Sequence, residues 1–308
     1  MPAITVDNLT KSFGQTLALD DLSFQVEEGE VFGFLGPNGA GKSTTINIVL
    51  DFARPTAGEV TVLGMDAQQH SRDIRRRTGV LPEGVETYDR LTARQHLEFA
   101  IESKNATDEP EALLERVGLV DAIDKKAGGY SKGMSQRLML AMALVGEPDL
   151  LILDEPSTGL DPNGAREMRD IVREENERGA TVFFSSHIME QVEAVCDRVG
   201  ILRDGEMVAV DSVEGLRDSV EGGTTLRVTV DRIDDDALQA VRSLPDVGSA
   251  TVEDGTPPTL IVDVDGSKTA VLSTLEDRGI EVQDFSTSEA SLDDVFRSYT
   301  TETEVHAR

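Results

Sequence analysis

The chain has 308 residues, and its 58 aspartates and glutamates outnumber its 29 lysines and arginines, which gives a formal net charge of −29. This length suits one large domain alone or with a small one, while the negative charge argues against non-specific binding of nucleic acid. A single cysteine, Cys196, excludes an internal disulfide, and the lack of both a membrane-length apolar run and a signal peptide at Met1–Asp7 predicts a cytoplasmic protein.

Apolar runs organise the first part of the chain. Short runs alternate with helical patterns up to residue 210, which is typical of an α/β fold. Between about residues 84 and 147 the pattern becomes mainly helical, so we predict a helical lobe inserted into that fold. The predicted buried strands are Val31–Leu35, Leu150–Leu153, Thr181–Ser186 and Arg198–Leu202.

A second, smaller domain is predicted after Glu221-Gly222-Gly223, where the composition shifts and a hinge is expected. Its strands and helices follow the order βαββαβ, which is the split βαβ arrangement of ferredoxin-like domains. We therefore predict one domain over 1–220, a small acidic α+β domain over 221–300 without catalytic residues, and a tail over 301–308. The elements of the small domain are Thr225–Val230, Asp235–Leu244 capped by Asp234, Val247–Val252, Leu260–Val264, Lys268–Asp277 and Glu281–Phe285.

A phosphate-binding loop is predicted at Gly36–Thr44, which fits the pattern G-x-x-x-x-G-K-[ST] between a strand and a helix. Its glycines let backbone amides converge on phosphate oxygens. Lys42 would reach the β- and γ-phosphates of ATP, and the Ser43 hydroxyl would ligate Mg²⁺. The expected nucleotide contacts in this loop are Gly36, Asn38, Gly39, Gly41, Lys42, Ser43 and Thr44.

Polar residues follow two other predicted strands. Asp154 and Glu155 come directly after the second strand, and His187 follows the third. Open α/β sheets bind their ligands at the carboxyl ends of the strands. We therefore predict that Asp154 lies beside the metal, Glu155 polarises the attacking water and His187 contacts the γ-phosphate. Together with Lys42, Glu155 and His187 are the predicted catalytic residues of ATP hydrolysis.

The acidic residues are scattered along the chain rather than collected in a tail. Self-repulsion on this scale destabilises a compact protein unless salt screens it. We hypothesise adaptation to a salt-rich, halophilic cytoplasm, with an ordinary acidic protein as the alternative.

In this order the motifs resemble the nucleotide-binding subunits of ATP-binding cassette (ABC) transporters, over Ile4 to about Ser212. Gly36–Thr44 is similar to the Walker A motif of that family and Leu150–Pro156 to its Walker B motif. Ser157–Asp161 resembles the D-loop, and His187 resembles the switch histidine. The resemblance implies a P-loop NTPase of the ABC ATPase type that uses ATP and Mg²⁺.

Tyr130–Arg137 stands where the family has its signature motif, usually Leu-Ser-Gly-Gly-Gln. In the family this motif acts in trans, so Ser131 and Gly133 would cap the γ-phosphate held by the opposite subunit. The resemblance thus implies a head-to-tail dimer, either of two copies or with a paralogous ATPase, with two ATP molecules at the interface.

Three motifs depart from the family pattern. The signature has Lys132 where glycine is usual and Tyr130 in place of leucine. At the Q-loop, Glu83 replaces glutamine, and a glutamate can still ligate magnesium although it cannot donate a hydrogen bond as an amide does. Phe13 stands in place of the adenine-stacking tyrosine, with a position in the core as the alternative.

These departures, with a tail Ser291–Phe296 similar to a closing motif, resemble the ABC-2 type exporter ATPases related to daunorubicin-resistance and sodium-export subunits. The resemblance implies an ATPase that powers export through a separate membrane permease, docked near Glu83–Leu97, so that the chain is peripheral on the inner face of the membrane. The alternative is a soluble ABC ATPase of DNA maintenance or translation. No coiled coil fits between Thr44 and Tyr130, and only one phosphate loop is present, which disfavours that alternative. The transported substrate is not predicted.

Overall fold

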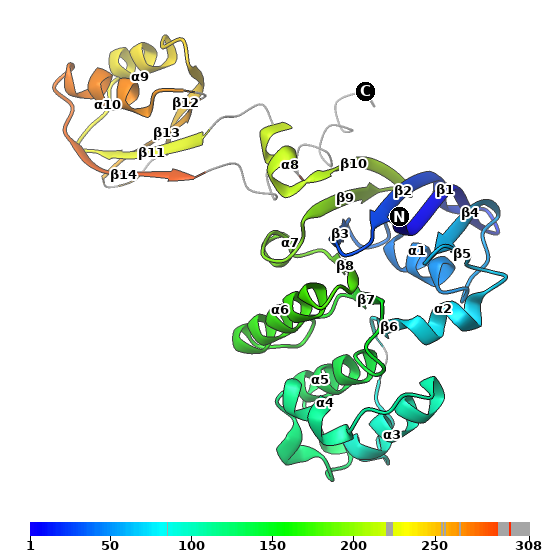
Figure 1. Cartoon of the computed structure of the whole chain (residues 1–308). Helices are drawn as coiled ribbons and strands as arrows, with labels where there is room; N and C mark the ends of the chain where they lie inside the picture. The colour runs from blue at the N-terminus through cyan, green and yellow to red at the C-terminus, as the bar shows by residue number, and fades with distance from the viewer. Residues whose placement is uncertain are drawn as a thin grey trace. The chain divides into compact units, whose positions relative to one another are not determined.

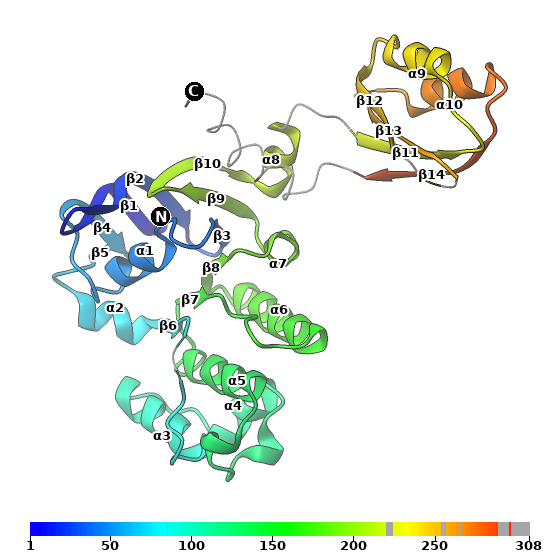
Figure 2. The same ribbon diagram turned by 180° about the vertical axis from the view of Figure 1, so that it is seen from behind.

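The computed structural model describes residues 1–84, 86–219, 224–253, 255, 257–264, 266–288 and 296. Its contacts divide the chain into two units, Met1–Val213 and Glu214–Arg308, and each unit is described by itself (Figures 1 and 2). The predicted hinge at residues 221–223, most of the motif Ser291–Phe296 and the tail 301–308 lie outside the described residues. The domain boundary between residues 220 and 221 stays a prediction.

The first unit contains two β-sheets. Their strand orders are β2-β1-β4-β5 and β10-β9-β3-β8-β7-β6. The first sheet is antiparallel, and the second is parallel except for β10. The predicted buried strands are present as β3, β7, β8 and β9, which confirms the α/β fold. The strands are β1 (Pro2–Phe13), β2 (Thr16–Glu27), β3 (Val31–Leu35), β4 (Ala57–Val62), β5 (Met65–Asp66), β6 (Thr78–Leu81), β7 (Leu150–Asp154), β8 (Thr181–Ser186), β9 (Arg198–Arg203) and β10 (Glu206–Ser212).

The parallel sheet is covered on both faces. Every residue of β3, β7 and β8 is buried, which explains why these strands are continuous apolar runs in the sequence. Helix α1 (Lys42–Val49) packs between the two sheets, and α6 (Pro162–Glu177) and α7 (Met189–Glu193) cover the opposite face of the parallel sheet (Figures 1 and 2). The parallel strands of this sheet, which exclude β10, have their carboxyl ends at one common edge, where the loops that follow them meet.

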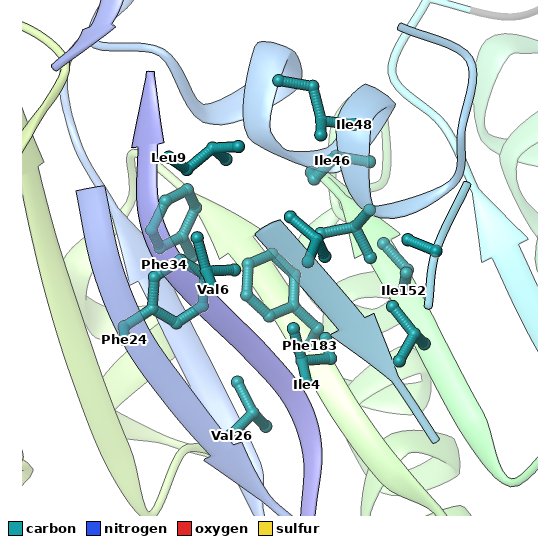
Figure 3. Close-up of a cluster of buried hydrophobic side chains, with 14 of the residues drawn as sticks. Ile4, Val6, Leu9, Phe24, Val26, Phe34, Ile46, Ile48, Ile152 and Phe183 are labelled. Atoms are coloured by element: carbon teal, nitrogen blue, oxygen red, sulfur yellow. The ribbon is translucent and has the colours of Figure 1, made fainter. Parts of the chain in front are cut away.

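A hydrophobic core fills the space between the two sheets and α1. Four phenylalanine rings stack in its centre, from Phe24, Phe32, Phe34 and Phe183, with centroids between 5.1 and 6.2 Å apart. Figure 3 shows side chains of β1, β2, β3, β7, β8 and α1 meeting there. Burying one such ring contributes about 1.5–3 kcal/mol, so this core holds α1 firmly against the ends of the strands.

A helical lobe is inserted between β6 and β7, as predicted. Thr92 begins its first helix with a capping box, because the Thr92 hydroxyl accepts from the Gln95 N–H while the Gln95 side chain accepts from the Thr92 N–H. Ser131 begins the last helix, and its hydroxyl accepts from the Met134 N–H at 3.2 Å. The elements here are α2 (Ser71–Arg77), which precedes β6, then α3 (Ala93–Lys104), α4 (Pro110–Arg116), the 3-10 turns η1 (Val120–Ala122) and η2 (Ala127–Gly129), and α5 (Lys132–Ala143).

The second unit has the predicted βαββαβ order. Its strand order is β12-β13-β11-β14, and all pairs are antiparallel, which is the split βαβ arrangement. It has a hydrophobic core of its own, which includes Leu226, Val228 and Val262. Helix α8 (Val213–Ser219) begins at the boundary between the two units. The elements that follow it are β11 (Thr224–Val230), α9 (Asp235–Arg242), β12 (Val247–Glu253), β13 (Thr259–Val264), α10 (Lys268–Glu276) and β14 (Val282–Ser288).

The net charge of −29 gives the first testable prediction, which concerns salt. Raising KCl from about 0.1 M to about 1 M shortens the screening length from ~10 to ~3 Å and weakens repulsion among exposed carboxylates. We expect the midpoint of thermal unfolding to rise steadily over this series. A sucrose series at matched osmolarity is the comparison: sucrose stabilises by exclusion from the protein surface but does not screen charge, so the midpoint should rise more in KCl than in sucrose. Full stability at low ionic strength would remove the hypothesis of salt adaptation.

Candidate nucleotide-binding site

The phosphate loop Gly36–Thr44 joins β3 to α1 in a conformation that requires glycine. Gly39 and Gly41 have φ angles of +86° and +113°. A Cβ atom on Gly41 would lie 2.6 Å from Cδ2 of Leu19 and 2.9 Å from the carbonyl oxygen of Ala18. Gly41 also caps α1, and no side chain bonds the first amides of that helix. These N–H groups are therefore available to an anion such as phosphate.

The close packing of Gly41 gives a second prediction. An L-residue in the left-handed conformation costs about 1–2 kcal/mol, and in Gly41→Ala the contacts with Ala18 and Leu19 add to this cost. We expect the affinity for ATP with magnesium, measured by calorimetry, to fall about tenfold or more. Gly64→Ala is the matched control, because Gly64 has a φ of +74° and open space around it. Equal affinities in the two variants would show that the shape of this loop does not matter for binding.

Lys42 is held inside the phosphate loop and is only 7% exposed. Its ammonium group donates to the carbonyl oxygens of Gly36 at 2.6 Å and Pro37 at 3.3 Å. The same Nζ atom lies 4.0 Å from Oε1 of Glu155. A buried cation at the start of a helix fits the charge of a triphosphate.

The carboxyl ends of β7 and β8 bring the predicted acids and histidine together. Asp154 pairs in register with Ser185, whose hydroxyl donates to Oδ1 of Asp154 at 2.5 Å. Nδ1 of His187 lies 2.9 Å from Oε1 of Glu155. The Ser186 hydroxyl donates to Oε2 of Glu155 at 3.5 Å. Lys42, Glu155 and His187 thus form one cluster around a single carboxylate.

Glu155 is oriented by its backbone as well as by its partners. It is buried, it has a positive φ of +49°, and its N–H donates to the Ser185 carbonyl oxygen at 3.0 Å. A non-glycine residue in this region of conformational space is uncommon and often marks a functional position. The two serines were not predicted as site residues, although a pair of hydroxyl residues at the end of an otherwise apolar strand was a visible signal.

The residues predicted to hold magnesium lie on three separate elements. Ser43 is exposed in the first turn of α1, Asp154 is buried at the end of β7, and Glu83 is exposed just after β6. Glu83 lines a cavity of about 540 Å³ together with Glu155. Among the described residues, no three His, Cys, Asp or Glu side chains could form a metal site by themselves. This fits magnesium, which is usually bound by one or two carboxylates together with phosphate oxygens.

The signature residues stand apart from this cluster. Ser131 and Gly133 line a cavity of about 660 Å³ with Gly159 and Leu160 of the D-loop, and Lys42 does not line it. The aliphatic part of Lys132 covers Gly159, where a Cβ atom would lie 2.6 Å from Cγ and Cδ of the lysine. Within one copy of the chain, the described contacts do not bring Ser131 to Lys42.

Phe13 ends β1 and is 54% exposed, so the alternative of a core position is wrong. Nζ of Lys11 lies 4.6 Å from its ring centroid, a cation–π distance. An exposed ring is what stacking on a base requires, and adenine stacking by Phe13 stays a prediction.

Known proteins match both units of the chain. A family model described as "ABC transporter" matches residues 19–158, and one described as "ATP-binding protein DrrA1-3-like, C-terminal domain" matches residues 212–300. The linearmycin resistance ATP-binding protein LnrL of Bacillus subtilis (strain 168) is 36% identical over 256 residues, which cover 82% of each chain. The chain belongs to the ATP-binding proteins of ABC transporters.

Two further matches extend the likeness of this ABC transporter ATP-binding protein. The daunorubicin resistance ATP-binding protein DrrA2 of Streptomyces coeruleorubidus is 34% identical over 308 residues, which cover 96% of this chain and 94% of the relative. A dimeric structure of a post-hydrolysis ATP-binding cassette bound to ADP and Pi superposes with a TM-score of 0.63 at 25% identity, over 68% of this chain and 98% of that one.

These matches decide between the functional alternatives. The protein is an ATPase that uses ATP and Mg²⁺, and the prediction of an ABC transporter subunit of the ABC-2 exporter group is confirmed. The alternative of a soluble ABC ATPase in DNA maintenance or translation has no support among them. Within the described part of the chain, every helix is too short or too polar to cross a bilayer.

Proposed function

We propose that this ABC ATPase powers export through a separate membrane permease. The observation that carries the catalytic part is the cluster around Glu155, with His187 Nδ1 at 2.9 Å and Lys42 Nζ at 4.0 Å from the same Oε1 atom. Export is supported by the relatives, whose names record resistance to linearmycin and to daunorubicin. In this proposal the permease selects the cargo, and the ATPase supplies the free energy.

Each residue of the cluster has a separate task in the proposed hydrolysis. Lys42 balances the charge of the β- and γ-phosphates, while the amides at the start of α1 bind their oxygens. Glu155 orients the attacking water and accepts its proton. His187 donates from Nδ1 to Glu155 and so holds the carboxylate in place. Ser43, Asp154 and Glu83 are the residues that would hold magnesium, and the ion would neutralise part of the phosphate charge.

A dimer is part of the proposal because one copy of the chain leaves the signature away from the phosphate loop. Ser131 caps α5 at the surface, on a cavity that Lys42 does not line. A head-to-tail dimer would place Ser131 of the partner subunit and its neighbour Gly133 against the ATP held by Lys42. The two subunits are two copies of this chain, or one copy and a paralogous ATPase.

We propose that the permease docks in a groove of the helical lobe, which we call the lobe groove. This docking would keep the chain at the inner face of the membrane. The groove has a volume of about 630 Å³. Tyr88 and Phe99 are 70% and 63% exposed there, and such exposed large apolar side chains mark contact surfaces. The groove is lined by Glu86–Leu91, His96, Phe99 and Met142. We propose that it receives a cytoplasmic helix of the permease.

Co-purification tests the proposed function. A tagged chain should be recovered from detergent-solubilised membranes of its source cell with a membrane protein of several apolar spans, and that protein should stimulate ATP turnover. Phe99→Ser should lose most of the membrane protein, while Phe52→Ser, at an equally exposed ring outside the lobe groove, should retain it. Recovery of the ATPase without a membrane protein, with full turnover, would contradict the proposal.

A further inference from the structure

His96 is an ionisable residue whose side chain is almost completely buried. It lies on α3, in the wall of the lobe groove, and is only 2% exposed. Both ring nitrogens are hydrogen-bonded: Nδ1 lies 2.8 Å from the Thr92 carbonyl oxygen, and Nε2 lies 3.0 Å from the Tyr88 backbone nitrogen. Neither contact belongs to the nucleotide site.

These two partners determine the tautomer of the imidazole. A carbonyl oxygen can only accept, so Nδ1 carries the proton and donates to Thr92. A backbone N–H can only donate, so Nε2 of His96 must present its lone pair to Tyr88. The ring is therefore neutral, with one defined tautomer. A proton on Nε2 would face the Tyr88 N–H and abolish that hydrogen bond.

The hydrogen bond from the Tyr88 N–H to His96 joins the loop Tyr88–Leu91, which lines the lobe groove, to α3. The Tyr88 ring stacks on the His96 ring with centroids 6.0 Å apart, although the tyrosine itself is 70% exposed. The Tyr88 carbonyl oxygen accepts from the Leu91 N–H at 3.0 Å, which closes a turn. His96 thus holds the backbone and the ring of an exposed residue of the lobe groove. The charged residues that share the groove, Glu86, Asp89 and Arg90, all lie on the same loop.

The same loop is bonded to the segment that leads into the signature motif. The Gly128 N–H donates to the Asp89 carbonyl oxygen at 3.1 Å, and the Ala127 N–H donates to the Leu91 carbonyl oxygen at 2.9 Å. The approach is close, because a Cβ atom on Gly128 would lie 3.0 Å from the Asp89 carbonyl oxygen. The N–H of Tyr130, the residue before Ser131, then donates to the Ala127 carbonyl oxygen. A continuous set of hydrogen bonds therefore joins the lobe groove to the start of α5.

We infer that His96 is a positioning residue for permease coupling. Its Nε2 lone pair holds the Tyr88–Leu91 loop in the shape that a permease helix contacts, and through Gly128 the loop is linked to Ser131. This inference rests on the proposed docking in the lobe groove. The hydrogen bonds and ring contact of His96, to Thr92 and Tyr88, involve none of the residues proposed to bind ATP or magnesium, so its effect is on coupling rather than on the chemistry of hydrolysis.

A pair of nearly isosteric substitutions separates the two hydrogen bonds of His96. In His96→Gln the side-chain oxygen reaches the place of Nε2 and can accept from Tyr88. In His96→Asn the amide nitrogen reaches the place of Nδ1 and can donate to Thr92, but nothing accepts from Tyr88. Hydrogen exchange of the Tyr88 amide in the full chain reports the tether directly. We expect wild-type-like exchange in the glutamine variant and exchange about fivefold faster or more in the asparagine variant.

Coupling is then measured as the ratio of permease-stimulated to basal ATP turnover, with the permease obtained by co-purification. The glutamine variant should keep this ratio and the asparagine variant should lose most of it, with similar unfolding temperatures. Equal ratios for the wild type and the asparagine variant would overturn the inference, as would equal losses in both variants. If the wild type binds no permease, the proposed function fails, and the exchange of the Tyr88 amide still decides whether His96 holds the loop.

Discussion

Glu155→Gln should bind ATP with near wild-type affinity and hydrolyse it about 10²–10⁴-fold more slowly, because an amide cannot accept the proton of the attacking water. The carboxylate is buried at the end of β7 and shares Oε1 with His187 and Lys42. An amide of the same shape keeps these neighbours in place, so the effect should fall on turnover alone. With ATP and magnesium the variant should accumulate as a dimer, since the closed state is not released by hydrolysis.

Single-turnover kinetics and size-exclusion chromatography with ATP measure both effects. Glu177→Gln is the matched control, because Glu177 is an exposed carboxylate on α6 away from the phosphate loop. The control should hydrolyse ATP like the wild type and show no ATP-trapped dimer. Wild-type turnover in Glu155→Gln would remove Glu155 from its proposed role.

Lys42→Ala should lose tight nucleotide binding. The ammonium group is buried and donates to two carbonyl oxygens of its own loop, which keeps its positive charge within the predicted phosphate site. Charge-assisted hydrogen bonds to a phosphate are worth about 1.5–3 kcal/mol, and the upper figure is roughly a hundredfold in affinity.

Calorimetric titration with ATP and magnesium gives the affinity of Lys42→Ala. Lys268→Ala removes one positive charge from the second unit and leaves the residues of the phosphate loop unchanged. It should bind ATP as the wild type does. Similar affinities for the two variants would show that the general loss of charge, and not the position of Lys42, controls binding.

The sequence predicted the parallel sheet well because its strands are buried on both faces. Continuous apolar runs such as Val31–Leu35 and Leu150–Leu153 leave a strong signal. The second unit could be predicted for a related reason, since alternation along β11 places Leu226 and Val228 in its core and leaves Arg227 exposed.

The nucleotide site could be predicted where its residues directly follow the end of a strand. Lys42, Glu155 and His187 come together because β3, β7 and β8 are neighbours in one sheet. Contacts set by three-dimensional packing left no comparable pattern. The spacing of residues did not predict that His96 accepts a hydrogen bond from the Tyr88 N–H, because a histidine at that position is equally consistent with an ordinary amphipathic helix.

Phe13 shows a limit of a different kind. An aromatic residue at the end of a predicted strand can face either the core or solvent, and the pattern left both open. The structure exposes it because it lies next to the tight β1–β2 turn at Gly14, where φ is +60°. The alternation of buried and exposed side chains along a strand is lost at such a turn, so it could not predict whether this side chain is buried.

A mixing experiment tests most directly whether Ser131 of the partner subunit completes the ATP site on Lys42. Lys42→Ala and Ser131→Arg should each abolish hydrolysis as pure proteins. In a mixed dimer of the two variants, one site carries both substitutions and the other carries neither. Mixing should therefore restore ATP hydrolysis, which is absent from either variant alone. If the mixture stays as inactive as its components although a mixed dimer forms, Ser131 does not act across the interface.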